Sequence, residues 1–288
     1  MTEPASRHYV SQRLSLHYVD WGASGAAPMV FVHGGRDHCR SWDRIARAFR
    51  NDAHVLATDL RGHGASDWST DRDYHLMDYV YDLATFVQQL DRSPVTLVGH
   101  SLGGNIAIRF AGLYPDTVRR LVAIEGLGPS PAMQRERQAV PTADRVRQWI
   151  AARQRATSMT PKTYASIDAA IDRMCAVNEH LSHEQASHLT RHGVTHNADG
   201  TVSWKFDPCV RLFSPIDLTQ ADFESLWAAI TCPVLLCYGA ESWASNPARD
   251  GRAERFADAR VVEYDNAGHW PHHDQTDAFI NDLRAFLQ

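Results

Sequence analysis

The sequence predicts an α/β fold, in which a mostly parallel sheet is flanked by helices and interrupted by an inserted, mainly helical segment. Short apolar strands alternate with amphipathic helices along most of the 288 residues. The alternation stops after Glu125 and resumes at Pro233. A Gly-x-Ser-x-Gly sequence, Gly99 to Gly103, marks a sharp turn between one strand and the helix that follows it.

The first part of the chain supplies the first strands of this sheet. Residues 14–21 alternate with period two, which predicts a half-exposed strand. Residues 29–32 form a continuous apolar run, which is typical of a strand buried on both faces of a parallel sheet. Residues 54–60 form the next strand, and helices are predicted at 42–49 and 79–90.

The Gly-x-Ser-x-Gly turn joins a strand at 95–98 to an amphipathic helix at 105–113, and residues 118–125 form another strand. After the interruption, the sequence predicts a strand, a helix, a strand and a terminal helix, at 234–238, 247–256, 260–264 and 274–287. Strands that alternate with helices in this way build a parallel sheet. We therefore assign residues 1–127 and 231–288 to one core domain.

Residues 128–230, inserted after the strand that ends at Glu125, are expected to form a helical cap on this core. Ser182 and Gln185 predict a capping box at the start of one helix. Asp199-Gly200 predicts the turn of a small hairpin. Three further sets of apolar residues each predict one helical face: Val146, Trp149 and Ile150; Tyr164, Ile167, Ile171, Met174 and Cys175; and Phe223, Leu226, Trp227 and Ile230.

Ser101, at the centre of the sharp turn, is the candidate nucleophile. A residue on so tight an elbow takes a strained conformation that raises its hydroxyl above the sheet edge, and the glycines beside it prevent clashes. The first N–H groups of the following helix point the same way and favour a developing negative charge. A serine hydroxyl still needs a base that removes its proton.

His269 is the candidate base. It lies in the loop after the strand at 260–264, so we expect it at the same sheet edge as Ser101. Gly268 permits an unusual backbone angle in this loop, and Pro271 stiffens the loop before the last helix.

Four motifs resemble those of the α/β-hydrolase fold family, and they occur in the family's order over nearly the whole core. They are His33-Gly34-Gly35, Asp59-Leu60-Arg61-Gly62-His63-Gly64, Gly99-His100-Ser101-Leu102-Gly103 and Gly268-His269-Trp270-Pro271. The resemblance implies a Ser–acid–His triad with Ser101 as nucleophile and His269 as general base. It also implies an oxyanion hole formed by the backbone N–H groups of Gly35 and Leu102.

The acid of the triad departs from the family pattern. Relatives usually carry an Asp three residues after the Gly that ends the strand following the cap, and here that Gly is Gly239 and the position is Ser242. A serine cannot supply the negative charge that stabilises an imidazolium. We favour Glu125, because certain haloalkane dehalogenases and lactone hydrolases take the acid from the neighbouring strand end. Glu241, one residue before the usual position, is the alternative.

The resemblance implies a serine hydrolase that cleaves a carboxylic ester or a lactone through an acyl-enzyme. Dehalogenases and epoxide hydrolases of this fold attack with Asp, so a serine at position 101 favours acyl transfer. Three alternatives stay open: a C–C bond hydrolase, a perhydrolase, and a low-turnover ligand receptor of the same fold.

Candidate substrate-binding residues come from the loop after the oxyanion strand, from the inserted segment and from the position after the base. They are Arg36, Asp37, His38, Trp149, Trp204 and Trp270. The loop residues lie where an acyl or alcohol group would pass, and the tryptophans of the inserted segment would suit a bulky apolar pocket. The alternative is that these side chains only pack the protein together.

Composition and charge argue against several kinds of partner. Hydrophobic residues at 44% and charged residues at 22% are typical of soluble globular proteins. A formal net charge of −5 gives no electrostatic reason to expect nucleic acid or an anionic membrane as partner. The N-terminal residues contain no apolar signal core and no later stretch is long enough to span a bilayer, so we expect a cytoplasmic protein.

The expected chemistry requires no cofactor, because the triad handles the proton transfers. The five cysteines are scattered, which suits a reducing compartment, and no Cys/His cluster has zinc-ligand spacing, so no metal is expected. A small-molecule substrate is the expected partner. The sequence does not decide between a monomer and a homodimer.

Overall fold

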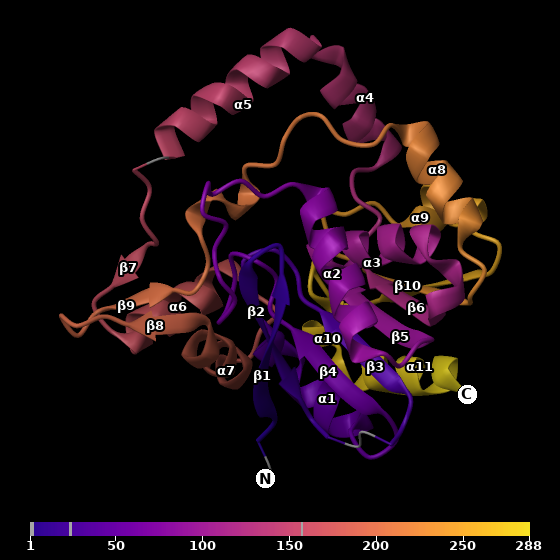
Figure 1. Cartoon of the computed structure of the whole chain (residues 1–288), viewed down its shortest axis with the longest axis horizontal. Helices are drawn as coiled ribbons and strands as arrows, with labels where there is room; N and C mark the ends of the chain where they lie inside the picture. Colours follow the sequence, from indigo (N-terminus) through magenta and orange to yellow (C-terminus); the bar gives the residue numbers. More distant parts are fainter. Residues whose placement is uncertain (1–2, 23–24, 157) are drawn as a thin grey trace.

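An eight-stranded, mostly parallel sheet forms the centre of the protein in a computed structural model (Figure 1). The structure describes residues 3–22, 25–156 and 158–288. The strand order is β1-β2-β4-β3-β5-β6-β10-β11, in which the β1–β2 and β2–β4 pairs are antiparallel and the later pairs are parallel. The strands are Ala5–Ser11, Leu14–Asp20, Pro28–Val32, His54–Thr58, Val95–His100, Val118–Ile124, Val234–Gly239 and Ala259–Tyr264, for β1 to β6, β10 and β11.

Helices cover both faces of the sheet (Figure 1). Successive side chains of a strand point to opposite faces. In β3, Phe31 therefore packs with residues of α1 (Asp43–Phe49) and α11 (Thr276–Leu287), whereas Val30 packs with residues of α2 (Leu76–Leu90) and α3 (Leu102–Leu113). The prediction that this apolar strand is buried on both faces is confirmed.

Strand β1 was not predicted from the sequence. It lies at the edge of the sheet, and most of its side chains are exposed, so it carries no apolar periodicity. A two-residue turn, Gln12-Arg13, joins it to β2, and both residues have positive φ, 47° and 69°. This is the backbone geometry that two-residue hairpins favour, although Asn-Gly is the usual sequence signal.

The helix predicted at 247–256 is wrong in extent. The structure has a four-residue helix, α9 (Pro247–Asp250), and then Gly251 at φ +80°. A left-handed glycine at this position ends a helix. Only a short 3-10 turn, Ala253–Arg255, follows before β11.

Between β6 and β10, the chain forms helices and a small three-stranded sheet. The helices are α4 (Pro131–Ala139), α5 (Thr142–Ala156), α6 (Ile167–Val177) and α7 (His183–Gly193), and the sheet contains β7 (Thr163–Tyr164), β8 (Val194–His196) and β9 (Val202–Trp204). The predicted capping box at Ser182 and the predicted hairpin are confirmed. The assignment of Tyr164 to a helical face is wrong, because Tyr164 pairs with Val202 in the small sheet.

The last helix of the predicted insertion packs with the core. Helix α8 (Gln220–Ala229) lies beside α3, where a Cβ added to Gly112 would meet the Leu226 carbonyl oxygen at 2.6 Å. Trp227 is 2% exposed and belongs to the same apolar cluster as α2 and α3. The expected range of 128–230 therefore includes a helix that packs on α3 of the core.

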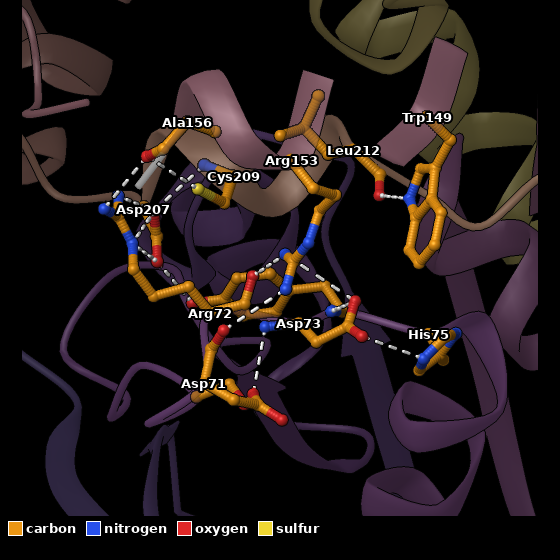
Figure 2. A network of polar contacts seen from close by, with 12 residues as sticks. Asp71, Arg72, Asp73, His75, Trp149, Arg153, Ala156, Asp207, Cys209 and Leu212 are labelled. Carbon is orange, nitrogen blue, oxygen red and sulfur yellow. Dashed lines mark hydrogen bonds and ion pairs between the residues drawn. The ribbon is translucent and has the colours of Figure 1, made fainter. Parts of the chain in front are cut away.

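A network of charged groups joins the core to the inserted segment (Figure 2). The Arg72 guanidinium donates to Asp207 at 2.6 Å and to the Ala156 carbonyl at 3.3 Å. Arg153 of α5 donates in return to the Arg72 carbonyl and to the Asp71 carbonyl. The Asp207 side chain is 0% exposed. Because Arg72 bonds to the end of α5 and Arg153 of α5 bonds back to residues 71 and 72, these contacts fix one end of α5 on the core loop.

Within the described residues, none of the helices is both long enough and apolar enough to cross a membrane.

Candidate active site

The turn between β5 and α3 places Ser101 at the carboxyl edge of the sheet. Ser101 has φ 49° and ψ −113°, a strained combination for a residue with a side chain. The glycines around it are required by close approach: a Cβ at Gly99 would lie 2.4 Å from the Gly103 carbonyl oxygen, and one at Gly103 would lie 2.2 Å from the Val32 carbonyl oxygen. The Ser101 N–H donates to the Ile124 carbonyl at 2.7 Å, which ties the turn to β6.

The loop between β11 and α10 (Pro271–Asp274) brings His269 to Ser101. The His269 Nε2 atom lies 3.0 Å from the Ser101 Oγ atom. Two contacts hold the loop: Asp274 accepts from the Gly268 N–H at 2.9 Å, and His100 bonds to the His269 carbonyl at 2.9 Å. Since the loop backbone is fixed on both sides, the imidazole has a defined position.

The Glu125 carboxylate contacts the other nitrogen of the same imidazole, Nδ1 of His269. Glu125 follows β6 directly, has φ +50°, and its side chain is 0% exposed. Its two oxygens also accept hydrogen bonds from the Gly239 N–H at 2.9 Å and from the Ser242 hydroxyl at 2.6 Å. The structure therefore brings Ser101, His269 and Glu125 into one hydrogen-bonded chain.

Glu241, the alternative acid, lies outside this chain. Its side chain is 54% exposed, and its carboxylate is 3.4 Å from Nε2 of His180. The Glu241 N–H donates to the Ala267 carbonyl at 2.9 Å, so its backbone supports the loop that carries His269.

Gly35 and Leu102, the expected oxyanion donors, lie next to each other. A Cβ built on Gly35 would be 3.9 Å from Cδ2 of Leu102. Leu102 is the first residue of α3, so its N–H has no acceptor within the helix. A Cβ on Gly34 would lie 2.6 Å from Nδ1 of His100, which explains a glycine in the preceding position.

Several histidines around the site are buried, and burial lowers their pKa values. The pKa of His33 falls to about 3 and that of His63 to about 4, chiefly because burial disfavours the charged imidazole. His33 accepts from the Leu60 N–H at 3.0 Å and donates to the Gly34 carbonyl at 2.6 Å. The neutral imidazole of His33, bonded at both ring nitrogens, ties these two loop segments together.

Five of the six predicted substrate-binding residues line one cavity between the loop after β3 and the inserted segment. They are Arg36, Asp37, His38, Trp204 and Trp270. Trp149 does not line it: the indole N–H donates to the Leu212 carbonyl at 3.0 Å (Figure 2), and the ring lines a separate surface depression. The size and aromatic character that make Trp149 a candidate do not place a residue of α5 relative to Ser101.

Two residues of the site were not predicted. Ser242 contacts the Glu125 carboxylate, and Trp243 places its ring 4.8 Å from the His269 ring while remaining 67% exposed. Only their position in the sequence could have indicated them, because both lie in the loop after Gly239, where relatives usually carry the acid.

Two groups of side chains among the described residues have the atom types and spacing of metal ligands. They are His17 with Cys39 and Asp59, and Asp43 with His188 and His192. In the first group, Asp59 already accepts from His17 and from the Cys39 N–H, at 2.8 and 2.6 Å. Neither group includes Ser101, His269 or Glu125. All five cysteines are free thiols.

The fold and the site define an α/β hydrolase. The chain belongs to the family described as the alpha/beta hydrolase fold, which it matches over residues 27–276. Esterase Rv0045c from Mycobacterium tuberculosis is 31% identical over 282 residues, which cover 93% of this chain and 84% of the relative. The sn-1-specific diacylglycerol lipase ABHD11 from Mus musculus is 28% identical over 286 residues, 95% of this chain and 85% of the relative.

A solved structure gives the same picture of the fold. The thioesterase domain from the curacin biosynthetic pathway superposes with a TM-score of 0.83 at 20% identity, covering 99% of this chain and all of that domain. The protein is therefore an enzyme of the hydrolase class whose relatives include an esterase and a lipase.

Proposed function

We propose that the protein is a serine hydrolase that cleaves a carboxylic ester or a lactone through an acyl-enzyme. The observation that carries the proposal is the hydrogen-bonded chain from Ser101 Oγ through His269 to Glu125. The esterase and lipase names of two relatives support the choice of an ester.

In the proposed acylation step, His269 Nε2 takes the proton from Ser101 Oγ as the oxygen attacks the substrate carbonyl. Glu125 holds Nδ1 protonated, so Nε2 is free to accept the proton, and it stabilises the imidazolium that forms. His269 then gives the proton to the leaving alcohol oxygen. In deacylation, His269 takes a proton from water as the water oxygen attacks the acyl carbonyl. The bond from the acyl carbon to Ser101 Oγ then breaks, Oγ takes the proton back from His269, and the carboxylic acid is released.

We assign the oxyanion hole to the N–H groups of Gly35 and Leu102. Both are backbone donors beside Ser101, and a fixed backbone donor needs no reorganisation when the negative charge develops. One such donor is worth about 2.7–4 kcal/mol in other hydrolases. The positive φ of Ser101 supports this geometry, because the turn aims the hydroxyl and the first helical N–H at one point.

We propose that the inserted segment before α8, residues 128–219, acts as the cap that selects the substrate. Trp204 lines the cavity next to the oxyanion loop from the inserted side, which supports this role. The network around Arg72 would hold such a cap on the core (Figure 2).

A fluorophosphonate probe tests the nucleophile directly. We expect the probe to label Ser101 in the purified protein and to leave the Ser101→Ala variant unlabelled. A short nitrophenyl ester should be hydrolysed by the wild type, and this turnover should disappear in Ser101→Ala while the circular dichroism spectrum is unchanged. Lack of labelling at Ser101 would refute the serine hydrolase mechanism, and labelling without ester turnover would favour a receptor.

A further inference from the structure

The cavity beside the oxyanion loop is lined by two cationic side chains, Arg36 and Lys205. Arg36 follows the proposed oxyanion donor Gly35 directly and is exposed. Within the described part of the chain, no hydrogen bond or ion pair engages the Arg36 guanidinium. Lys205 donates to the His192 carbonyl at 3.1 Å, which leaves two of its three donors for a ligand.

One acidic residue opposes the two cations in the lining of the cavity. Asp37 is the acidic residue that lines the cavity, and it is 7% exposed. Its carboxylate accepts from the His38 N–H at 2.8 Å, within its own loop. Two cationic side chains thus face one carboxylate in this cavity, so its lining carries a net positive charge.

Two residues that line the cavity are chain neighbours of residues at the reaction centre. Arg36 is the neighbour of Gly35, and Trp270 is the neighbour of the proposed base His269. The cavity is small, about 10 Å³, which is the space of one water-sized group. It suits the end of a compact polar group better than a long apolar chain.

We propose that the substrate is an ester or lactone carrying a second, anionic group, a carboxylate, which the Arg36 guanidinium and the Lys205 ammonium bind. The inference rests on the proposed function and specifies its substrate class. A guanidinium matches a carboxylate in a two-pronged geometry, and such charge-assisted bonds are stronger than neutral ones. Arg36 keeps this position at φ +65°, a backbone conformation that residues other than glycine rarely adopt.

Two matched pairs of chromogenic esters test the proposal. In the first, para-nitrophenyl hydrogen glutarate carries the carboxylate on the acyl side, and its methyl ester is the neutral partner. In the second, para-acetoxy-meta-nitrobenzoate carries the carboxylate on the alcohol side, again with its methyl ester. The quantity measured is the ratio of kcat/KM for the charged ester to that for the neutral ester.

In the wild type, we expect this ratio to be about ten in one pair, which one charge-assisted hydrogen bond can supply. The Arg36→Met variant should lose most of this preference, and Lys205→Met should lose part of it. Arg191→Met is the matched control: Arg191 is an exposed arginine of α7, bonded to Ser187 one turn away, and its loss should leave the ratio unchanged.

Cleavage of the neutral esters with no preference for the charged partner in either pair would overturn this inference alone. A preference for the charged ester that survives in both Arg36→Met and Lys205→Met would also overturn it. If Arg36→Met does not fold, the ratio measured for Lys205→Met decides the question. Failure to cleave any of the four esters would overturn the proposed function, and this inference with it.

Discussion

Strands β6 and β10 are neighbours in the sheet, and the residues that follow them differ in a way that matters for the site. After β6, Glu125 turns at φ +50° and buries its carboxylate against His269. After β10, the usual position of the acid is Ser242, which donates to that same carboxylate at 2.6 Å. The end of β10 carries no carboxylate at this position, but its Ser242 hydroxyl holds the Glu125 carboxylate in place.

Parallel strands that lie side by side end at the same edge of the sheet. Glu125 and Ser242 are 117 residues apart in the chain, yet they meet because β6 and β10 pair. We expect that a carboxylate at either strand end can serve His269 when the other end supplies a hydrogen-bond donor. Four variants test this expectation, from the largest expected effect to the smallest.

Glu125→Gln should have the largest effect. The amide keeps the shape but carries no charge, and it no longer fixes the imidazole tautomer, so we expect kcat to fall by about 10³ to 10⁴. The measurement is hydrolysis of a nitrophenyl ester, with circular dichroism as the check on folding. A loss below tenfold would mean that Glu125 is not the acid.

The double variant Glu125→Gln/Ser242→Asp moves the carboxylate to the neighbouring strand end. We expect it to recover about 10- to 100-fold of the activity lost in Glu125→Gln, because a charged partner again stabilises the imidazolium. The same assay on both variants measures the recovery. No recovery in a folded double variant would show that the two strand ends are not interchangeable.

Ser242→Ala removes one hydrogen bond to the buried carboxylate. We expect kcat to fall by about tenfold, since a bond to a charged group contributes about 1.5–3 kcal/mol and the other Glu125 contacts remain. Ser242→Thr keeps the hydroxyl and should retain most of the activity. Equal losses in the two variants would indicate that packing, not the hydrogen bond, is what matters here.

Glu241→Gln should have the smallest effect, less than about twofold in kcat, because an exposed ion pair contributes little. Glu241 is 54% exposed and pairs with His180, away from the base. If Glu241→Gln abolished turnover while Glu125→Gln did not, the roles assigned to the two glutamates would be reversed.

Local sequence patterns were sufficient to predict most strands and helices of the core. The alternation of apolar strands and amphipathic helices predicted the strands on both sides of the Ser101 turn. Periodicity separates them because side chains repeat their direction every two residues in a strand but about every 3.6 residues in a helix. It failed at β1, whose exposed edge needs no apolar side chains, and at residues 251–256, where Gly251 ends the helix in a left-handed conformation. Edge strands and helix ends depend on few local contacts, so periodicity is a weak signal there.

The sequence by itself determined the nucleophile candidate and the base candidate. The glycines that the Ser101 turn requires, and the loop setting of His269, are local features that a short motif records. Tertiary structure alone decided which carboxylate meets the base, because strand pairing, not chain spacing, sets the distance between Glu125, Ser242 and His269. It also separated Trp149 from the other residues of the proposed substrate cavity, since the position of a helix in the inserted segment depends on long-range contacts such as those of Arg153 with Arg72.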